Sequence, residues 1–263
     1  YRFNKENKSS FLFYDFPQID IVNLKSIEKI FLKNKIFAVI NCAAYTNVSL
    51  AESEKMKCSD VNTKGVKNLV EICEKFSSKL IHFSTDYVYD SDTKEPIREN
   101  SKIDPQNHYG FSKRMGEVYI ENSKIESIIL RTSWLYSKFG KNFVNTIIEK
   151  AKSQAEINIV DNEFGTPTYA RDLAEVTLKI LDSNNRIDTN GKIYNYSNLG
   201  ETNWFSFAKE IVKLSNISCK VKPISSSKFQ SKVRRPKYSV MCKKKIIKDF
   251  EIKIKHWKDS LKF

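Results

Sequence analysis

Three short, largely apolar runs, at 36–40, 80–83 and 128–130, constrain the fold of this chain more than any other feature. None of them alternates with polar residues, which is typical of parallel strands covered on both faces. Helical patterns separate the runs, and each run ends in small or polar residues. This order predicts an α/β fold with a doubly wound parallel sheet.

Weaker patterns complete the expected architecture. Phe11 to Tyr14 reads as a further buried strand that ends at Asp15. Apolar spacing predicts helices at 24–32, 66–76, 143–151, 171–181 and 205–214, another helix beginning near Tyr109, and strands at 158–160, 193–196 and near Val221. A chain of 263 residues suits a large domain with a small one attached. We place the large domain at 1–135, with 171–198 returning to it, and the small C-terminal part at 136–170 and 199–263.

The cysteines and apolar runs bear on the compartment. Five cysteines form no CxxC pair, and with three scattered histidines they give neither a zinc-binding spacing nor a disulfide framework. This usage predicts a reducing, cytoplasmic compartment. No apolar run approaches the roughly 18 residues of a membrane span, so no membrane partner is expected.

A net charge of +14 raises nucleic acid as a partner. The lysines are spread through nearly every segment, and the densest run, Lys243 to Lys245, has no interleaved aromatic residue. Most of the charge therefore reads as a solvated surface, and no nucleic-acid partner is predicted.

Tyr109 and Lys113 lie four residues apart where a helix is expected to begin. Residues at this spacing share a helical face, and a lysine ammonium near a phenol lowers the phenol's pKa from its ordinary value of about 10. Such a tyrosine can exchange a proton with a carbonyl or alcohol oxygen. The alternative is a tyrosine packed on its own helix and a lysine in solvent.

Other polar residues follow the predicted strands. In open α/β sheets ligands bind beyond the carboxyl ends of the strands, where segments 41–46, 84–88 and 131–134 are expected. His82 lies inside its strand and reads as a core residue.

Six motifs occur in order: Asn-Cys-Ala-Ala-Tyr-Thr at 41–46, Ser-Thr-Asp-Tyr-Val at 84–88, Tyr-Gly-Phe-Ser-Lys at 109–113, Arg-Thr-Ser-Trp at 131–134, Phe-Gly-Thr-Pro-Thr at 164–168 and Arg-Arg-Pro at 234–236. Together they resemble the dTDP-4-dehydrorhamnose reductases of the extended short-chain dehydrogenase/reductase superfamily. The resemblance implies a Rossmann-type dinucleotide-binding domain, a small substrate-binding part, and reduction of the C4 ketone of dTDP-4-dehydro-L-rhamnose by NADPH or NADH.

The resemblance also implies roles for individual residues. Tyr109 would protonate the C4 oxygen, Lys113 would lower the phenol pKa and hold the nicotinamide ribose, and Thr85 would hydrogen-bond the carbonyl oxygen. The positions matching substrate contacts are Thr85, Asp86, Tyr87, Val48, Trp134, Arg234 and Arg235. Those matching the cofactor site are Asp20, Ile21, Ala44, Tyr45, Thr46, Phe83, Tyr109 and Lys113. No metal ligands are placed.

Each assignment has a structural alternative. Thr85 and Asp86 are residues that commonly end a strand and begin a turn. Trp134 could serve as a core residue, and Arg234 and Arg235 as solvated charges, although two guanidiniums suit a diphosphate.

The chain departs from the family at its start. The superfamily opens with a strand and a glycine-rich turn that meets the cofactor pyrophosphate, whereas the first glycine here is Gly65. The first strand, the turn and the first helix would then be missing. Together they form a βα unit of about 30 residues. We expect the native protein to have this segment, the sheet edge to be exposed without it, and the given chain to be inactive. A smaller departure is Ser49-Leu50-Ala51-Glu52, where the family usually has Asp-Lys-Ala-Glu.

Several functional questions stay open at this stage. The competing hypotheses are another nucleotide-sugar epimerase or dehydratase of the superfamily, and a non-catalytic regulatory subunit of the kind that serves methionine adenosyltransferase. The choice between NADH and NADPH is set around Asp15 and in the glycine turn. A homodimer is one expected state, and the end product of the pathway is undetermined.

Overall fold

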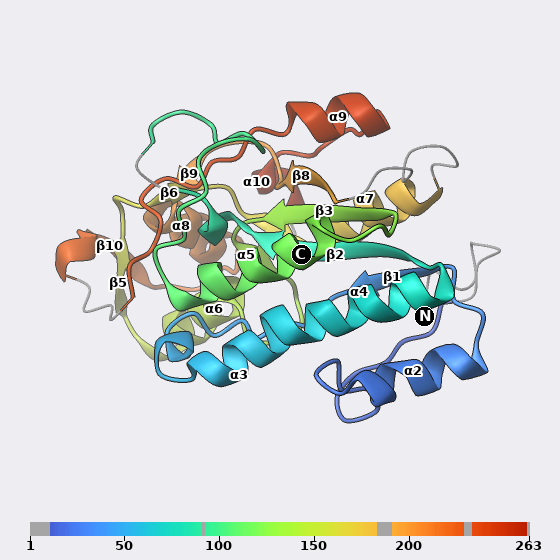
Figure 1. The fold of residues 1–263 in the computed structure, drawn as a ribbon. Helices are drawn as coiled ribbons and strands as arrows, with labels where there is room; N and C mark the ends of the chain where they lie inside the picture. Colours follow the sequence, from blue (N-terminus) through green and yellow to red (C-terminus); the bar gives the residue numbers. More distant parts are fainter. Residues whose placement is uncertain (1–10, 91–92, 183–190, 229–232, 262–263) are drawn as a thin grey trace.

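The computed structural model describes residues 11–90, 93–182, 191–228 and 233–261. A parallel sheet lies at its centre, with strand order β1-β2-β3-β8 (Figure 1). These strands are β1 (Ala38–Asn41), β2 (Lys79–Thr85), β3 (Ser127–Thr132) and β8 (Lys192–Tyr196). The predicted α/β fold with a parallel sheet is confirmed.

Helices cover both faces of this sheet. Leu80 of β2 and Ile129 of β3 pack with two helices on one face, and the adjacent Ile81 and Ile128 pack with two others on the opposite face. Because successive side chains of a strand point to opposite faces, continuous apolar runs are what a doubly covered sheet requires. The helices are α4 (Gly65–Phe76) and α5 (His108–Glu121) on the first face, and α7 (Ala170–Asp182) and α9 (Lys244–Phe250) on the second.

A second core lies beside the sheet and centres on Phe207, Ile211 and Trp257. Aromatic side chains dominate it; the rings of Phe143 and Phe207, for example, stack with centroids 5.6 Å apart. It is built from α6 (Phe143–Ser153), β5 (Glu156–Val160), α8 (Trp204–Leu214), β10 (Lys220–Ile224) and α10 (Trp257–Ser260). The remaining described elements are short: η1 (Leu50–Glu52), α3 (Lys55–Ser59), η2 (Asp60–Lys64), η3 (Asp86–Val88), β4 (Leu135–Tyr136), β6 (Phe164–Gly165), β7 (Thr168–Tyr169), β9 (Thr202–Asn203) and η4 (Ser226–Lys228).

The domain boundaries given above stay a prediction. Their parts at 1–10, 91–92, 183–190, 229–232 and 262–263 lie outside the described residues. Helix α9, which falls in the expected small part, packs through Ile246 and Phe250 on the large sheet.

The predicted strand at Phe11–Tyr14 is wrong. This segment is not part of a sheet, and Leu12, Phe13 and Tyr14 are 52%, 70% and 41% exposed. A strand needs a neighbour to take its backbone hydrogen bonds, and among the described strands β1 pairs with β2 alone. One edge of β1 thus has no partner strand in the described part of the chain.

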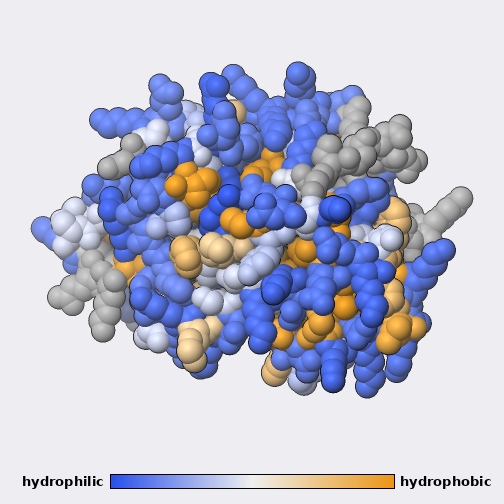
Figure 2. Space-filling view, in the orientation of Figure 1, coloured by the Kyte–Doolittle hydropathy of each residue, from blue (hydrophilic) through white to orange (hydrophobic). Residues whose placement is uncertain are grey.

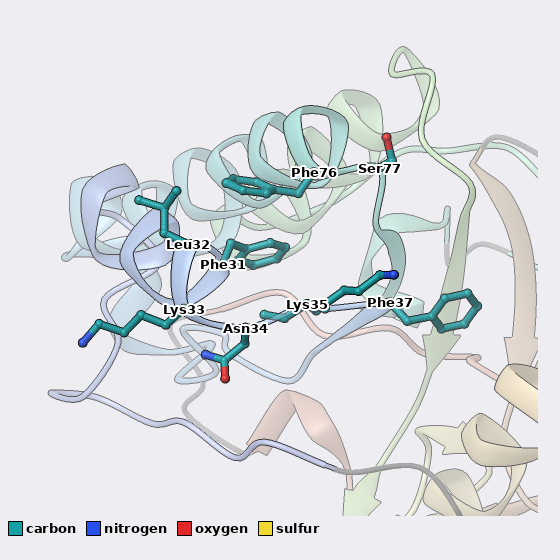
Figure 3. Close-up of a pocket in the computed structure, with 9 residues that line it drawn as sticks. Phe31, Leu32, Lys33, Asn34, Lys35, Phe37, Phe76 and Ser77 are labelled. Atoms are coloured by element: carbon teal, nitrogen blue, oxygen red, sulfur yellow. The ribbon is translucent and has the colours of Figure 1, made fainter.

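Helix α2 (Leu24–Lys33) covers α4 and borders a pocket at the amino end of β1. The pocket has a volume of about 670 Å³ and apolar walls formed by Phe31, Leu32, Phe37 and Phe76 (Figure 3). Polar side chains cover most of the molecular face in Figure 2, and apolar ones gather at its lower right, in the region of α2 and α4. No residue predicted for catalysis or binding lines this pocket.

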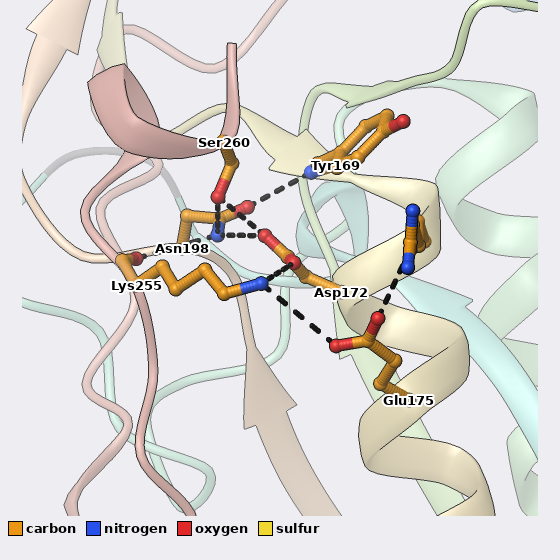
Figure 4. A network of polar contacts seen from close by, with 7 residues as sticks. Tyr169, Asp172, Glu175, Asn198, Lys255 and Ser260 are labelled. Carbon is orange, nitrogen blue, oxygen red and sulfur yellow. Dashed lines mark hydrogen bonds and ion pairs between the residues drawn. The ribbon is translucent and has the colours of Figure 1, made fainter. Parts of the chain in front are cut away.

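A polar network fastens α7 to the C-terminal segment (Figure 4). The buried Asp172 carboxylate accepts hydrogen bonds from Asn198 Nδ2 at 2.7 Å, Lys255 Nζ at 3.0 Å and Ser260 Oγ. Asn198 Oδ1 in turn accepts from the Tyr169 backbone at 2.8 Å. Burial works to raise the pKa of Asp172, but the hydrogen bonds outweigh it and the pKa is lowered.

We expect Asp172→Asn to destabilise the fold by about 1.5–3 kcal/mol at neutral pH, because hydrogen bonds to a charged acceptor are lost. A carboxyl with a lowered folded pKa stabilises above its unfolded pKa of about 3.9, and this stabilisation is lost as pH falls through the folded value. Chemical denaturation over acid and neutral pH should show the difference from the unaltered protein narrowing below about pH 4. Glu175→Gln, which removes a 42% exposed carboxylate 3.8 Å from Lys255, is the control. An equal loss in both variants would contradict the prediction.

Candidate active site

The predicted catalytic residues meet at the carboxyl end of β2. Thr85 is the last residue of this strand, and Tyr109 lies in the first turn of α5. The Thr85 hydroxyl lies near enough to the Tyr109 phenol to lower its pKa by hydrogen bonding. The ring of Tyr87 packs edge-on against that of Tyr109, with centroids 5.6 Å apart and an interplanar angle of 81°.

The start of α5 is fixed by local sequence. Asn107 caps the helix, accepting a hydrogen bond from the Gly110 backbone at 2.8 Å. A Cβ at Gly110 would lie 2.3 Å from the carbonyl oxygen of Tyr87, so any other residue would push the helix away from η3. Glycine beside Tyr109 therefore allows the phenol to reach Thr85.

Lys113 is buried and directed toward the sheet. Its ammonium donates to the carbonyl oxygen of Phe83 at 2.6 Å and lies 3.3 Å from His82 Nε2. Burial lowers its pKa to about 8, although Glu117 opposes this effect. His82 is fully buried, and its Nδ1 contacts Asn41 Nδ2 at 3.0 Å. The prediction that His82 is a core residue is confirmed.

The prediction that Lys113 lowers the pKa of Tyr109 is wrong for this structure. Burial raises the Tyr109 pKa above its ordinary value, and the opposing contribution comes from Thr85. The Lys113 ammonium is bonded instead to Phe83, and no hydrogen bond joins it to the phenol among the described contacts. Sharing a helical face does not ensure contact, because a long side chain follows the strongest acceptor within reach.

Asp86 is a buried carboxyl beside the two catalytic candidates. Its Oδ1 accepts from Thr85 Oγ1 at 3.1 Å. Its Oδ2 has no partner at normal hydrogen-bonding geometry among the described residues, although Ser239 lies near enough to lower the pKa slightly. Burial dominates and raises the Asp86 pKa to about 7. A turn-forming aspartate in solvent would not show this shift, so the simple turn interpretation does not account for Asp86.

We expect Asp86→Asn to stabilise the protein at alkaline pH while impairing substrate binding. With a folded pKa of about 7, the folded chain binds more protons than the unfolded chain between about pH 4 and 7, so stability falls as pH rises through this interval. Asparagine carries no charge, so the variant does not lose stability in this way. Denaturation should show a gain on the order of 2–4 kcal/mol above pH 7 that vanishes near pH 4. Asp104→Asn, which removes a 46% exposed carboxylate, should show no such gain. A pH-independent effect of Asp86→Asn would count against a raised pKa.

Trp134, expected at the substrate, packs against the second core. Its φ of 48° is unusual for a bulky residue, and its ring stacks on Trp204 with centroids 3.4 Å apart. A Cβ at Gly165 would lie 2.6 Å from the Trp134 indole, so the Phe-Gly-Thr-Pro-Thr motif makes room for it. Trp134 is only partly buried, and the core interpretation alone does not describe it.

The two adjacent arginines differ. Arg235 faces Tyr87 and Glu163 electrostatically, and its buried Nε has no partner among the described residues. Arg234 is exposed and donates to Gln106 Oε1 at 2.8 Å. Arg235 is therefore directed to the same region as Tyr87, whereas Arg234 lies at the surface.

The residues expected at the cofactor divide into two groups. Ala44, Tyr45 and Thr46 follow β1 at the same sheet edge as Thr85, as does Val48, which was expected at the substrate; Phe83 supplies the carbonyl that holds Lys113. Asp20 and Ile21 form a turn before α2: the Asp20 carboxylate accepts from the Val22 backbone at 2.9 Å, and Ile21 is buried in the core with Leu69 and Ile72. No described contact joins this turn to Tyr109 or Lys113.

Two residues near the site escaped the sequence analysis. Asn62, in the π-helical turn η2, pairs with both backbone groups of Tyr45 at 2.9 and 3.0 Å and donates to Ser112 Oγ at 3.0 Å. It thereby joins the loop after β1 to α5. Glu117, four residues after Lys113, is fully buried and paired with Arg131. The spacing of Glu117, four residues after Lys113, could have placed it on the same helical face from the sequence alone. No sequence pattern pointed to Asn62.

The described residues fit the nicotinamide end of a dinucleotide. A buried ammonium lies at the end of β2, and small, exposed Cys42 and Ala43 follow β1. The sequence offers no glycine before Gly65 for a pyrophosphate-binding turn. In the described residues no group of three metal-ligating side chains occurs, and no helix has the length and apolar character for crossing a bilayer.

Comparisons with known proteins give one consistent result. The family model described as RmlD substrate binding domain matches residues 2–263. The chain is 34% identical to a dTDP-4-dehydrorhamnose reductase from Sinorhizobium fredii, with 84% of this chain and 77% of that protein aligned. A solved reductase structure from Clostridium acetobutylicum matches with a TM-score of 0.93 and 34% identity, over 99% of this chain and 91% of that one. A Bacillus anthracis reductase in complex with NADP matches with a TM-score of 0.89 and 33% identity, over 94% and 86%.

Proposed function

Because the chain belongs to the dTDP-4-dehydrorhamnose reductase family, we propose that it reduces the C4 ketone of dTDP-4-dehydro-L-rhamnose to give dTDP-L-rhamnose. The observation that carries this proposal is the meeting of Thr85 and Tyr109 at the carboxyl end of β2, with the Lys113 ammonium buried beside them. The protein is an NAD(P)H-dependent oxidoreductase of dTDP-rhamnose biosynthesis.

Tyr109 acts as the proton donor. Because burial raises its pKa, the phenol is fully protonated at neutral pH and has a proton to give. The oxygen at C4 becomes strongly basic as the ketone is reduced, so a weakly acidic phenol is well matched to it. The proton would therefore move from Tyr109 to O4 as C4 is reduced.

Thr85 and Lys113 support this transfer electrostatically. The Thr85 hydroxyl lies beside the phenol and can donate to the same substrate oxygen as charge develops there. Lys113, with a pKa of about 8, is largely protonated at neutral pH. Its ammonium, held by the carbonyl of Phe83 two residues before Thr85, adds positive charge to the end of β2, where negative charge develops on the substrate.

A bound nicotinamide supplies the two electrons and the hydrogen that C4 receives. Lys113 and the segment Ala44, Tyr45 and Thr46 hold its ribose end, and Phe83 fixes the orientation of Lys113. NADPH and NADH are both candidates.

Asp86, Tyr87, Val48 and Trp134 contact the sugar, and Arg235 contacts the diphosphate. The buried, unpartnered Oδ2 of Asp86 and Nε of Arg235 support this assignment, because buried polar groups are normally hydrogen-bonded. Arg234, at the exposed edge, contributes charge to the same diphosphate.

We expect the protein to act in the cytoplasm, and a homodimer is one expected state. All five cysteines are free thiols, which supports a reducing compartment.

The experiment uses the full-length protein with dTDP-4-dehydro-L-rhamnose and either NADPH or NADH. Cofactor oxidation is followed by absorbance. NMR of the product shows whether its C4 hydroxyl is axial or equatorial. We expect stoichiometric oxidation and a single product, dTDP-L-rhamnose. Interconversion of sugars without net cofactor oxidation would favour an epimerase or dehydratase. Cofactor binding without turnover of any dTDP-sugar would favour a regulatory subunit.

A further inference from the structure

A buried ion pair lies directly behind the proposed catalytic residues. Arg131 of β3 donates to both carboxylate oxygens of Glu117, from Nε at 2.8 Å and from Nη2 at 2.7 Å. The side chains are 1% and 0% exposed. Arg114 adds a third bond to Glu117 at 3.0 Å, and the Arg131 guanidinium lies over the Tyr89 ring, 4.7 Å from its centroid. The pair is thus bidentate and fully desolvated.

The position of Glu117 relates it to the catalytic residues. Tyr109, Lys113 and Glu117 follow one another at intervals of four along α5, so they share one face of the helix. Glu117 lies one helical turn after Lys113, and its negative charge works against the lowering of the Lys113 pKa by burial.

We propose that Glu117, held by Arg131, is a positioning residue for the reaction: it anchors α5 to β3 and keeps the Lys113 ammonium charged and in place at the end of β2. This inference rests on the proposed function of Tyr109 and Lys113. A buried ion pair is not required for stability, since apolar residues of similar volume often serve as well. Its retention beside Lys113 fits an electrostatic role.

The other groups that face Lys113 do not provide this charge. They are His82 of β2, whose imidazole is neutral because burial holds its pKa well below the ordinary value, and the thiols of Cys42, after β1, and Cys58, of α3. Desolvation by the surrounding protein raises the pKa of both thiols, that of the partly accessible Cys42 as well as that of the buried Cys58, so they too are neutral at physiological pH. Glu117 is the one carboxylate among these neighbours.

The test measures the Lys113 pKa directly in the full-length protein. Lysine labelled with ¹⁵N is titrated by NMR through its Nζ shift, and the Lys113 signal is assigned by its loss in Lys113→Met. The variants are Glu117→Gln and the double variant Glu117→Met with Arg131→Met, which removes both charges together. The control is Glu121→Gln, on the same helix, whose carboxylate is also bonded to Arg114 but is 30% exposed.

We expect the Lys113 pKa to fall by about one unit in Glu117→Gln, to fall by less in the double variant, which also removes a positive charge, and to stay unchanged in Glu121→Gln. The alkaline limit of kcat for reduction should move to lower pH by the same amount, with KM for the sugar little changed. If Glu117→Gln does not fold, the double variant decides. A Lys113 pKa that is unmoved in the double variant would overturn the proposal. The titration does not depend on turnover, so a protein that reduces no dTDP-sugar would fail the proposed function while the pKa shift still reports on Glu117.

Discussion

Replacing Tyr109 by phenylalanine should reduce kcat for sugar reduction by roughly 10²–10⁴-fold, the usual contribution of a positioned general acid. The substitution removes a single oxygen, from a phenol that lies beside Thr85 and packs against Tyr87. Because the ring contact persists, cofactor affinity and melting temperature should change little. Single-turnover kinetics with saturating NADPH measure the reduction step itself, so slow product release does not mask the loss.

Tyr119→Phe provides the matched control, since it makes the same change on the same helix at a residue that is 37% exposed. It should leave the rate unchanged. A Tyr109→Phe variant that retained more than a tenth of the wild-type single-turnover rate would exclude Tyr109 as the proton donor. Attention would then turn to Asp86, whose raised pKa also lets it hold a proton near neutral pH.

Replacing Arg131 alone by methionine should destabilise the fold by about 3–5 kcal/mol, because the Glu117 carboxylate is left buried and only partly paired. Arg131 also donates to the Glu99 backbone at 3.3 Å and packs on Tyr89, so its loss affects β3, α5 and the loop near Glu99 together. Chemical denaturation measures the effect, with cofactor omitted so that ligand binding does not restore stability.

Two further variants test whether charge burial is the cause. The double variant Glu117→Met with Arg131→Met should recover most of the loss, since no charge is then left unpaired. Arg114→Met breaks a bond to the same Glu117, but its side chain is 24% exposed, so it should cost about 1 kcal/mol or less. A double variant as unstable as Arg131→Met would show that packing, not the unpaired carboxylate, sets the cost.

The apolar runs at 36–40, 80–83 and 128–130 were sufficient to place β1, β2 and β3, because continuous apolar strands are stable only in a sheet covered on both faces. Helix α5 was equally readable, although its cap at Asn107 was found only in the structure. The strand predicted at Phe11–Tyr14 was wrong, although this run is as apolar as the others. A strand is defined by the neighbour that takes its hydrogen bonds, and a local pattern carries no information about that neighbour.

The candidate site shows the same division. The motifs at the strand ends located Thr85 and Trp134, since a parallel sheet gathers the ends of its strands at one edge, and the motif at 109–113 located Tyr109 at the start of α5. The roles of Asn62 and Glu117 were not readable, because their partners Tyr45 and Arg131 are brought to them by packing.

By itself, the sequence indicated which segments meet at the carboxyl ends of the strands, because helical and strand periodicities fix the direction of each side chain within its own element. Only the tertiary structure decided their protonation and contacts. Burial raises the pKa of Tyr109 and Asp86 and lowers that of Lys113, and desolvation depends on everything that surrounds a group in space. The Lys113 ammonium is bonded to Phe83 for the same reason: an acceptor from another element lies within its reach.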